Sequence, residues 1–265
     1  MLVLTKRLAQ TIWGCAKAHL AERTDMSKVQ LHLAGESNLP LESLGDAYRR
    51  LLLSLQNRQG MMNAIGGTKP VKGVLFGFDP VKTQEHYTGD WRLLFRRVQH
   101  DVRPRSRMAI NNPLNYWVVF CKGALDGAAY LSQFPDLNSF ARFVNRFATS
   151  ALAAPGLPMI LSHEIHGFGF ALACDFLKES GWSQYAKPDI HTMRILRGLG
   201  VSDGSAYLTF KTMVRMAEMV GEEPYTVDNV LWLIGSGNLH ELGETFQTNR
   251  AEFIRATSKR LKELA

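Results

Sequence analysis

The chain has 265 residues, 46% hydrophobic and 21% charged, which suits a globular protein with one large core or two lobes. No run reaches the roughly 18 apolar residues that a membrane span needs, and Lys6 and Arg7 stand where a signal peptide would be apolar. Lysine and arginine number 31 against 24 acidic residues, and the net charge of +7 favours a polyanionic partner such as nucleic acid.

The three cysteines, Cys15, Cys121 and Cys174, stand far apart in the sequence. An iron–sulfur cluster needs four ligands that are usually close together, and a structural zinc site usually carries CxxC pairs, so neither site is expected. His163 and His166 flank Glu164, but the zinc motif HExxH needs a longer spacing to place both imidazoles on one helical face. We therefore predict free thiols, no metal site and no cofactor, in a cytoplasmic protein that does not enter a membrane.

Apolar residues recur at helical intervals over most of the chain, which predicts a mainly α fold. KGVLFGF, residues 72–78, is the one segment with the composition of a strand, so a small β element is expected there. VRPRSR, residues 102–107, is a basic loop, and Pro113 follows it in the first turn of the next helix. Further helices are predicted at 2–22, 41–58, 90–100, 136–149, 157–165, 170–180, 190–199, 205–220, 226–234 and 247–263.

IHGFGFALA, residues 165–173, joins two of these helices through a turn that contains Gly167 and Gly169. Glycine allows backbone angles closed to residues with a Cβ, and it lets another molecule approach the main chain. The amides at the start of the second helix, at the positive end of its dipole, can bind a phosphate without any side-chain charge. A tight helical corner without a ligand would use the same two glycines, so the pattern alone leaves both interpretations open.

Asp189 follows the second glycine by twenty residues, in the sequence KPDIH. Pro188 disfavours helical angles at Lys187, so the chain enters the next helix from an extended segment and places Asp189 at or near the N-cap. Aspartate is a favoured N-cap for structural reasons alone. The same position would also hold a functional carboxylate rigidly.

The hairpin, the spacing and the D-x-H motif together resemble the helix-hairpin-helix (HhH-GPD) DNA glycosylase superfamily of endonuclease III and adenine glycosylase. The residues that match its L-P-G-V-G hairpin are Ile165, Gly167, Phe168 and Gly169, with His166 in place of the proline. Asp189 and His191 match the family's aspartate and the histidine two positions later. The close match covers about 30 residues, and a looser helical similarity runs from about 110 to 240.

The resemblance implies a two-lobed, all-helical glycosylase fold. We expect an N-terminal helical region at 1–105, a glycosylase core at 106–240 and a C-terminal helix at 241–265 that packs back on the core. The absence of a cysteine cluster separates the chain from the iron–sulfur branch of the superfamily.

The resemblance also implies a reaction and a partner. Such enzymes take double-stranded DNA, flip a damaged or modified base out of the helix and hydrolyse its N-glycosidic bond, the first step of base excision repair. Asp189 would be the carboxylate that stabilises the oxocarbenium-like transition state and orients water. Members that also cut the backbone carry a lysine where this chain has Ala171, so a monofunctional enzyme without lyase activity is expected, although Lys178 and Lys187 lie nearby in sequence.

Several further residues are candidates for contacts with DNA. Asn111 and Asn112 lie where family members often fill the gap left by the flipped base, but asparagine also caps helices. Arg103 and Arg105, with Arg107, would bind phosphates if their loop is not merely a solvated one. Other candidates are Lys187 and His191 for DNA binding, and Trp232, Trp91 and Phe168 for stacking on a base, where core packing is the alternative for Trp232.

The family would also imply a structural monovalent cation held by main-chain carbonyls of the hairpin, and we expect a monomer. A different class of function fits the same motifs. A non-catalytic helix-hairpin-helix protein would keep the hairpin for DNA binding and use Asp189 only as a helix cap. The sequence does not identify the base that an enzyme would remove.

Overall fold

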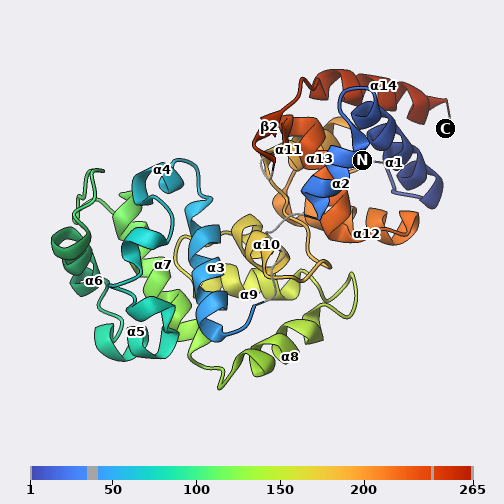
Figure 1. Ribbon diagram of the computed structural model, residues 1–265. Helices are drawn as coiled ribbons and strands as arrows, with labels where there is room; N and C mark the ends of the chain where they lie inside the picture. Colours follow the sequence, from blue (N-terminus) through green and yellow to red (C-terminus); the bar gives the residue numbers. More distant parts are fainter. Residues whose placement is uncertain (1, 35–40, 240–241, 264–265) are drawn as a thin grey trace. The chain divides into compact units, whose positions relative to one another are not determined.

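The computed structural model describes residues 2–34, 41–239 and 242–263, and nearly all regular structure in them is helical, which confirms the mainly α class (Figure 1). In many helices the side chain of the N-cap residue accepts an N–H of the first turn, as at Thr5, Asp136 and Ser205. By its contacts the chain divides into two compact units. Unit 1 holds 1–39, 150–155 and 181–265, and unit 2 holds 40–149 and 156–180.

Unit 1 is built around α13 (Pro224–Ser236), which packs against α1 (Lys6–Ala21), α11 (Ile190–Gly198) and α12 (Ala206–Val220). α14 (Arg250–Lys262) covers α1 and also touches α11 and α13. The short α2 (Met26–Leu33) contacts the two-stranded antiparallel sheet of β1 (Asn238–Leu239) and β2 (Glu244–Thr245). The first and last helices of the chain therefore share one core.

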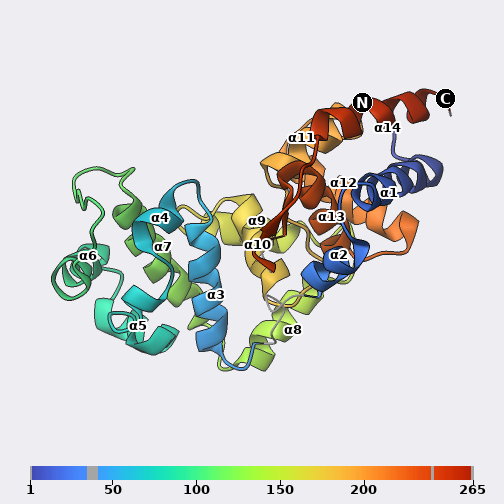
Figure 2. The ribbon, with the colours of Figure 1, turned by 45° about the horizontal axis from the view of Figure 1, so that its top comes forward.

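Unit 2 is built around α7 (Tyr116–Leu131), which is buried on most of its circumference. Its neighbours are α3 (Leu44–Gln56), α4 (Met61–Ile65), α5 (Pro80–Tyr87), α6 (Trp91–Arg97) and α9 (Gly156–Glu164). α8 (Leu137–Phe147) packs on α9, and α10 (Phe170–Glu179) lies against α9 and α3 (Figures 1 and 2). Lys122 and Asp126 are the only charged side chains within α7, one turn apart.

The β element predicted at 72–78 is wrong. The segment forms tight helical turns that end in a 3₁₀ turn at Phe76–Phe78, and the small sheet lies instead at β1 and β2. Phe76, Gly77 and Phe78 all have positive φ values, 51°, 71° and 73°, which no β-strand uses. The apolar side chains were mistaken for a strand because they are buried without a regular period: Val74, Leu75 and Phe78 face the core of unit 2.

The boundaries of the two compact units differ from those of the predicted segments 1–105, 106–240 and 241–265. α1 joins the last helices in unit 1, while the residues from 41 to 105 join α7 in unit 2. The helix predicted to begin at Pro113 begins at Tyr116, after the N-cap Asn115. Composition cannot reveal such a division, because each unit is assembled from separated stretches of the chain.

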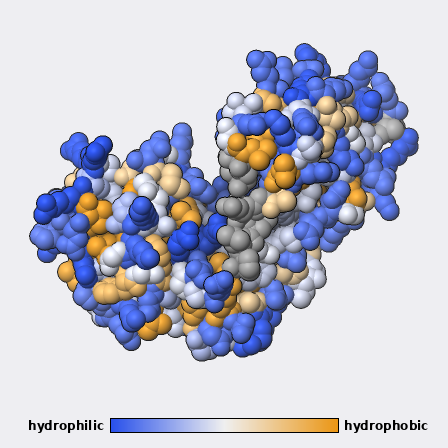
Figure 3. Space-filling model, viewed as in Figure 1, coloured by the Kyte–Doolittle hydropathy of each residue, from blue (hydrophilic) through white to orange (hydrophobic). Residues whose placement is uncertain are grey.

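Among the described residues, no helix is long and apolar enough to cross a membrane. The face of the molecule in Figure 3 is mostly hydrophilic, with hydrophobic residues scattered across it. Residues 35–40, within the stretch that precedes α3, and 240–241, between the two strands, lie outside the described part of the chain.

Candidate functional site

The predicted hairpin forms as expected: α9 ends at Glu164, α10 begins at Phe170, and residues 165–169 make the turn between them. Gly167 has a φ of +75°, and a Cβ there would lie 2.5 Å from Cγ1 of Val119 on α7. Only glycine fits this position, because any side chain would be both strained and blocked. Ile165 and Phe168 are almost fully buried and anchor the turn to the core of unit 2.

Gly169 differs from Gly167, and the expectation that both glycines serve unusual backbone angles is wrong for it. Its φ of −66° and ψ of 164° are open to any residue, and a Cβ would meet nothing within 4 Å. Gly169 is the N-cap of α10 and offers no capping side chain. Within the described residues, no group accepts the N–H of Gly169 or of Ala171. Open space in front of free amides at a helix N-terminus suits an anion.

The turn is fixed to α7 by a second pair of contacts. The carboxylate of Asp126 accepts the main-chain N–H of His166 at 2.9 Å. A Cβ on Gly123 would lie 2.6 Å from the carbonyl oxygen of His166, so the two main chains touch there. Sequence analysis missed Gly123 and Asp126. A glycine and an acid within a mostly apolar helix were their only local signal, and it does not indicate that they contact the hairpin.

Two cationic side chains lie near the turn, and we call Arg58, Lys122, His166 and Gly169 the hairpin face. A guanidinium nitrogen of Arg58 lies 3.7 Å from the Cβ position of Gly167. The ring of Trp91 has Lys122 Nζ at 5.0 Å from its centre, and Arg92 Cζ at 4.6 Å. The pKa of His166 is lowered, first by burial and then by Lys122 and Arg58, while Asp126 raises it. The positive charge of this face therefore comes from Arg58 and Lys122.

The basic loop is anchored to its surroundings at Ser106. Ser106 donates to the carbonyl of Ala64 at 2.7 Å and accepts from Trp117 Nε1 at 2.8 Å. Arg103, Arg105 and Arg107 are exposed and alternate with partly buried residues, so the loop is anchored on one side and basic on the other. Arg103 also adopts a left-handed φ of 50°.

Asn111 and Asn112 are exposed on the turn that follows, and neither caps a helix, since Asn115 does. Asn112 Oδ1 instead accepts the N–H of Leu114 at 3.0 Å, an Asx-turn. The side chain of Leu114 is 73% exposed there. An apolar side chain on an exposed loop is the kind of group that inserts between bases, and sequence analysis did not single it out.

Asp189 is the N-cap of α11 in unit 1, as predicted. Its Oδ1 accepts the N–H groups of His191 at 2.8 Å and Thr192 at 2.9 Å. Among the described residues, Oδ2 accepts no hydrogen bond, and the residue is partly exposed. One oxygen therefore serves the helix while the other is available for chemistry.

The segment that carries Asp189 is held by α13. The carboxylate of Asp228, which is 1% exposed, accepts the main-chain N–H of Lys187 at 2.7 Å. Pro188 is buried, and the N–H of Asp189 is bonded to the carbonyl of Lys187 at 2.9 Å. Asp228 thus positions the aspartate through its neighbour. A buried acid inside the apolar sequence YTVDNVLW was the signal for it.

His191 does not project freely from α11. Its ring lies over Gly235 of α13, where a Cβ would come within 2.5 Å of the His191 Cβ, and its Nδ1 is buried without a partner among the described residues. The ring of Trp232 is 6.4 Å away, edge-on, and the ring of His32 stacks on Trp232 at 6.2 Å. Trp232 is partly exposed, so packing and base stacking both remain compatible with its position.

No family model matches the chain, and no curated protein or solved structure matches it either. The resemblance to the glycosylase superfamily therefore rests on the hairpin and on the aspartate motif.

Few described side chains near the hairpin or Asp189 could bind a metal ion. The described residues contain no group of three histidine, cysteine, aspartate or glutamate side chains that could hold a metal ion. At the hairpin, the carbonyl of Ile165 accepts the N–H of Phe168, and that of His166 packs on α7. The monovalent cation at the hairpin stays a prediction.

Proposed function

We propose that the protein is a monofunctional DNA glycosylase that acts inside the cell, as a monomer, in base excision repair. The observation that carries the proposal is the pair of glycines in the hairpin: Gly167 is required by its φ and by its packing, whereas Gly169 is required by neither. A ligand that approaches the main chain would give Gly169 a role beyond that of an N-cap.

The proposed binding step uses the hairpin face of unit 2. A DNA phosphate takes the N–H groups of Gly169 and Ala171, and Arg58 and Lys122 supply the charge that the turn itself lacks. The arginines of the anchored loop add phosphate contacts, and Leu114 or Asn112 occupies the space of the flipped base. Trp91 or Trp232 provides a stacking surface, with Lys187 and His191 as further DNA contacts.

The proposed chemical step uses Asp189. As the base leaves, positive charge develops on the sugar, and the carboxylate stabilises it while Oδ2 orients the attacking water. The helix amides that donate to Oδ1 fix the position of the side chain. Ala171 has no nucleophile, and Lys178 is 5% exposed and 3.6 Å from Glu179, which supports an enzyme without lyase activity.

Asp189→Asn tests the chemistry without a change in the fold, because asparagine caps a helix as well as aspartate does. We expect base release from DNA carrying a panel of alkylated, deaminated and oxidised bases to fall by at least about a hundredfold, while duplex binding and thermal stability stay near those of the unchanged protein. Asp189→Ala is the matched comparison that also loses the cap. Full base release by Asp189→Asn would remove the residue from the mechanism.

The second candidate is a DNA-binding protein without chemistry. It is favoured by the fact that capping alone accounts for the contacts of Asp189, whereas the hairpin face gathers groups for binding. It predicts that no base is released from any DNA in the panel, and that Asp189→Asn changes nothing measurable.

A further inference from the structure

Two segments of unit 2 that are distant in the sequence meet in one basic region. The first is 61–72, which holds α4 and the 3₁₀ turn η2 (Lys69–Val71). The second is 96–107, which holds the end of α6, the π-helical turn η4 (Val98–Val102) and the basic loop (Figure 1). η2 packs against η4, and Ser106 of the loop donates to the carbonyl of Ala64 in α4 at 2.7 Å.

This region carries most of the excess positive charge of the chain. Its two segments hold seven of the 31 lysine and arginine residues and one of the 24 acidic residues, a net charge of +6 against +7 for the whole chain. The one acid, Asp101, is already paired, because it accepts from Arg97 Nε at 3.3 Å and from His100 Nδ1 at 2.7 Å. The other six cations are exposed and have no carboxylate partner among the described residues: Lys69, Lys72, Arg96, Arg103, Arg105 and Arg107. Exposed cations that no acid compensates attract a polyanion.

An open hollow of about 310 Å³ lies where η4 meets the loop, at the small end of the range of ligand sites. Among the described residues it is lined by a cation, an amide, a hydroxyl and two apolar side chains, and by no acid: Arg103, Gln99, Ser106, Pro104 and Met108. Arg103 is exposed, and of its guanidinium nitrogens only Nε is used, which donates to the carbonyl of His100 at 3.0 Å. Its two terminal nitrogens are therefore available for a phosphate, beside apolar atoms against which a base can pack.

Exposed apolar side chains continue this region at the start of α7. The loop reaches α7 through Asn115, whose Nδ2 donates to the carbonyl of Arg107 at 3.0 Å. On either side of Asn115 in the sequence, Leu114 is 73% exposed and Tyr116 is 37% exposed. The hydroxyl of Tyr116 lies against the main chain at Gly60, where a Cβ would come within 2.5 Å of it. An exposed aromatic ring beside a row of cations is typical of sites for single strands, whose bases are free to stack on it.

We propose that this surface binds single-stranded nucleic acid. The backbone phosphates pair with the exposed cations, one nucleotide occupies the hollow with its phosphate on Arg103, and an unpaired base stacks on Tyr116. The chemistry that is recognised, a chain of phosphates with unpaired bases, is common to DNA and RNA. The surface shares the loop arginines with the proposed duplex contacts but includes neither the hairpin glycines nor Asp189, so it does not require glycosylase activity.

Three fluorescein-labelled probes of equal length test the proposal by fluorescence anisotropy with the full chain. They are an oligothymidylate, which does not pair with itself, an abasic strand with the same phosphates, and a blunt duplex. We expect the oligothymidylate to bind at least about fivefold more tightly than the abasic strand, which is the lower end of the contribution of one stacked base.

Variants separate the base from the phosphates. Tyr116→Leu should remove the preference for oligothymidylate over the abasic strand and leave duplex affinity unchanged, whereas Tyr116→Phe keeps the ring and should bind normally. Arg103→Gln should reduce the log–log slope of oligothymidylate affinity against salt by about 0.7, the value for one phosphate of a single strand. Arg142→Gln, on the exposed side of α8, should leave that slope unchanged. Gly169→Ala and Asp189→Asn should bind oligothymidylate normally, whatever they do to duplex binding and base release.

Three results would overturn the proposal: oligothymidylate is not bound, the abasic strand binds equally well, or Arg103→Gln and Tyr116→Leu keep full affinity and an unchanged salt slope. The second result means that the surface recognises phosphates alone. The third means that the single strand binds elsewhere on the protein. Circular dichroism shows whether each variant is folded, and Arg103→Gln changes only an exposed side chain, so it tests the surface even if Tyr116→Leu is unstable.

Discussion

The two hairpin glycines make opposite predictions when each is replaced by alanine. At Gly167, the left-handed φ of +75° costs a side chain about 1–2 kcal/mol, and the Cβ placed 2.5 Å from Val119 adds about 1–3 kcal/mol of overpacking. Alanine recovers about 0.4–1 kcal/mol by restricting the unfolded chain. We therefore expect Gly167→Ala to lower the free energy of unfolding by about 1–4.6 kcal/mol.

At Gly169 the same change should be almost silent for stability. Its backbone angles suit alanine, and a Cβ meets nothing within 4 Å. Alanine is a poorer N-cap than glycine, but the gain from the unfolded state offsets this, so the net change stays within about 0.5 kcal/mol. DNA binding should nevertheless weaken several-fold, because the methyl group stands in front of the N–H groups that the phosphate uses.

Urea denaturation followed by circular dichroism measures the two stabilities, and amide exchange in α9 and α10 reports whether a loss is local to the hairpin. Fluorescence anisotropy with duplex DNA measures binding under conditions where both variants are folded. Equal destabilisation by the two substitutions would contradict the reasoning from geometry. Unchanged DNA binding by Gly169→Ala would mean that no phosphate approaches the main chain at that glycine.

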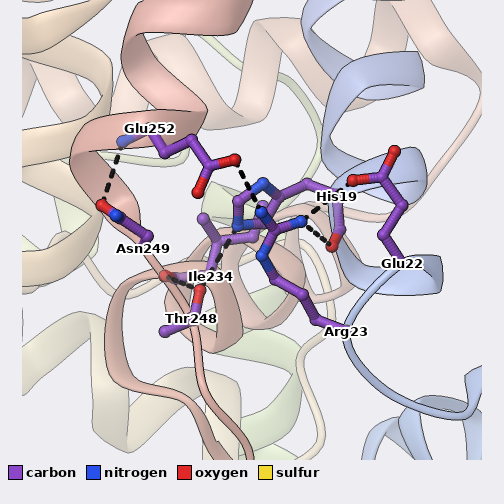
Figure 4. Close-up of polar contacts among 7 residues, drawn as sticks. All are labelled: His19, Glu22, Arg23, Ile234, Thr248, Asn249 and Glu252. Atoms are coloured by element: carbon purple, nitrogen blue, oxygen red, sulfur yellow. Dashed lines mark hydrogen bonds and ion pairs between the residues drawn. The ribbon is translucent and has the colours of Figure 1, made fainter.

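Arg58→Gln should reduce the log–log slope of duplex affinity against salt by about 0.9, the value for one phosphate contact. Arg142→Gln, which changes an exposed residue of α8, should leave the slope unchanged. Equal slopes in the two variants would remove Arg58 from the interface. Asp126→Ala leaves the N–H of His166 without its acceptor and should cost about 1–2 kcal/mol in urea denaturation. It should also lower the pKa of His166 further in an NMR titration, because Asp126 raises it; an unchanged titration would contradict that contact. Burial, and then Arg23, lower the pKa of His19 in the folded protein (Figure 4), so as the pH falls the unfolded chain binds a proton at this residue before the folded protein does. The stability that neutral His19 contributes is therefore present above pH 6.5 and is lost as the pH falls below that value. His19→Gln should therefore show a flatter decline of urea-denaturation stability on the acid side, and an identical decline would refute that assignment.

The sequence predicted helices well where their apolar stripe is regular and their ends are marked. The hairpin helices and α11 begin and end within a residue of expectation, because Gly169 and Asp189 mark their starts. The prediction failed where the buried residues do not recur at a regular interval along the chain. Residues 72–78 turn tightly with Phe76 and Phe78 at positive φ, and no local rule expects two aromatic residues there.

The candidate site was predictable as motifs but not as an arrangement. The N-cap role of Asp189 follows from local sequence, since Pro188 and the next turn define it. Lys122, Asp126 and Asp228 could not be connected to the motifs, because their partners lie about 40 residues away in sequence. Such contacts depend on which helices pack together, which a single sequence does not state.

The order in which the chain returns to unit 1 has a consequence for its biosynthesis. α1 leaves the ribosome before any of unit 2, yet it packs against α12, α13 and α14, which leave after unit 2 is complete. All the residues of unit 2 are made before α11 begins, so unit 2 can fold while the protein is still being translated. The apolar side of α1, with Ile12, Trp13 and Leu20, therefore stays without these partners until α12, α13 and α14 have been made.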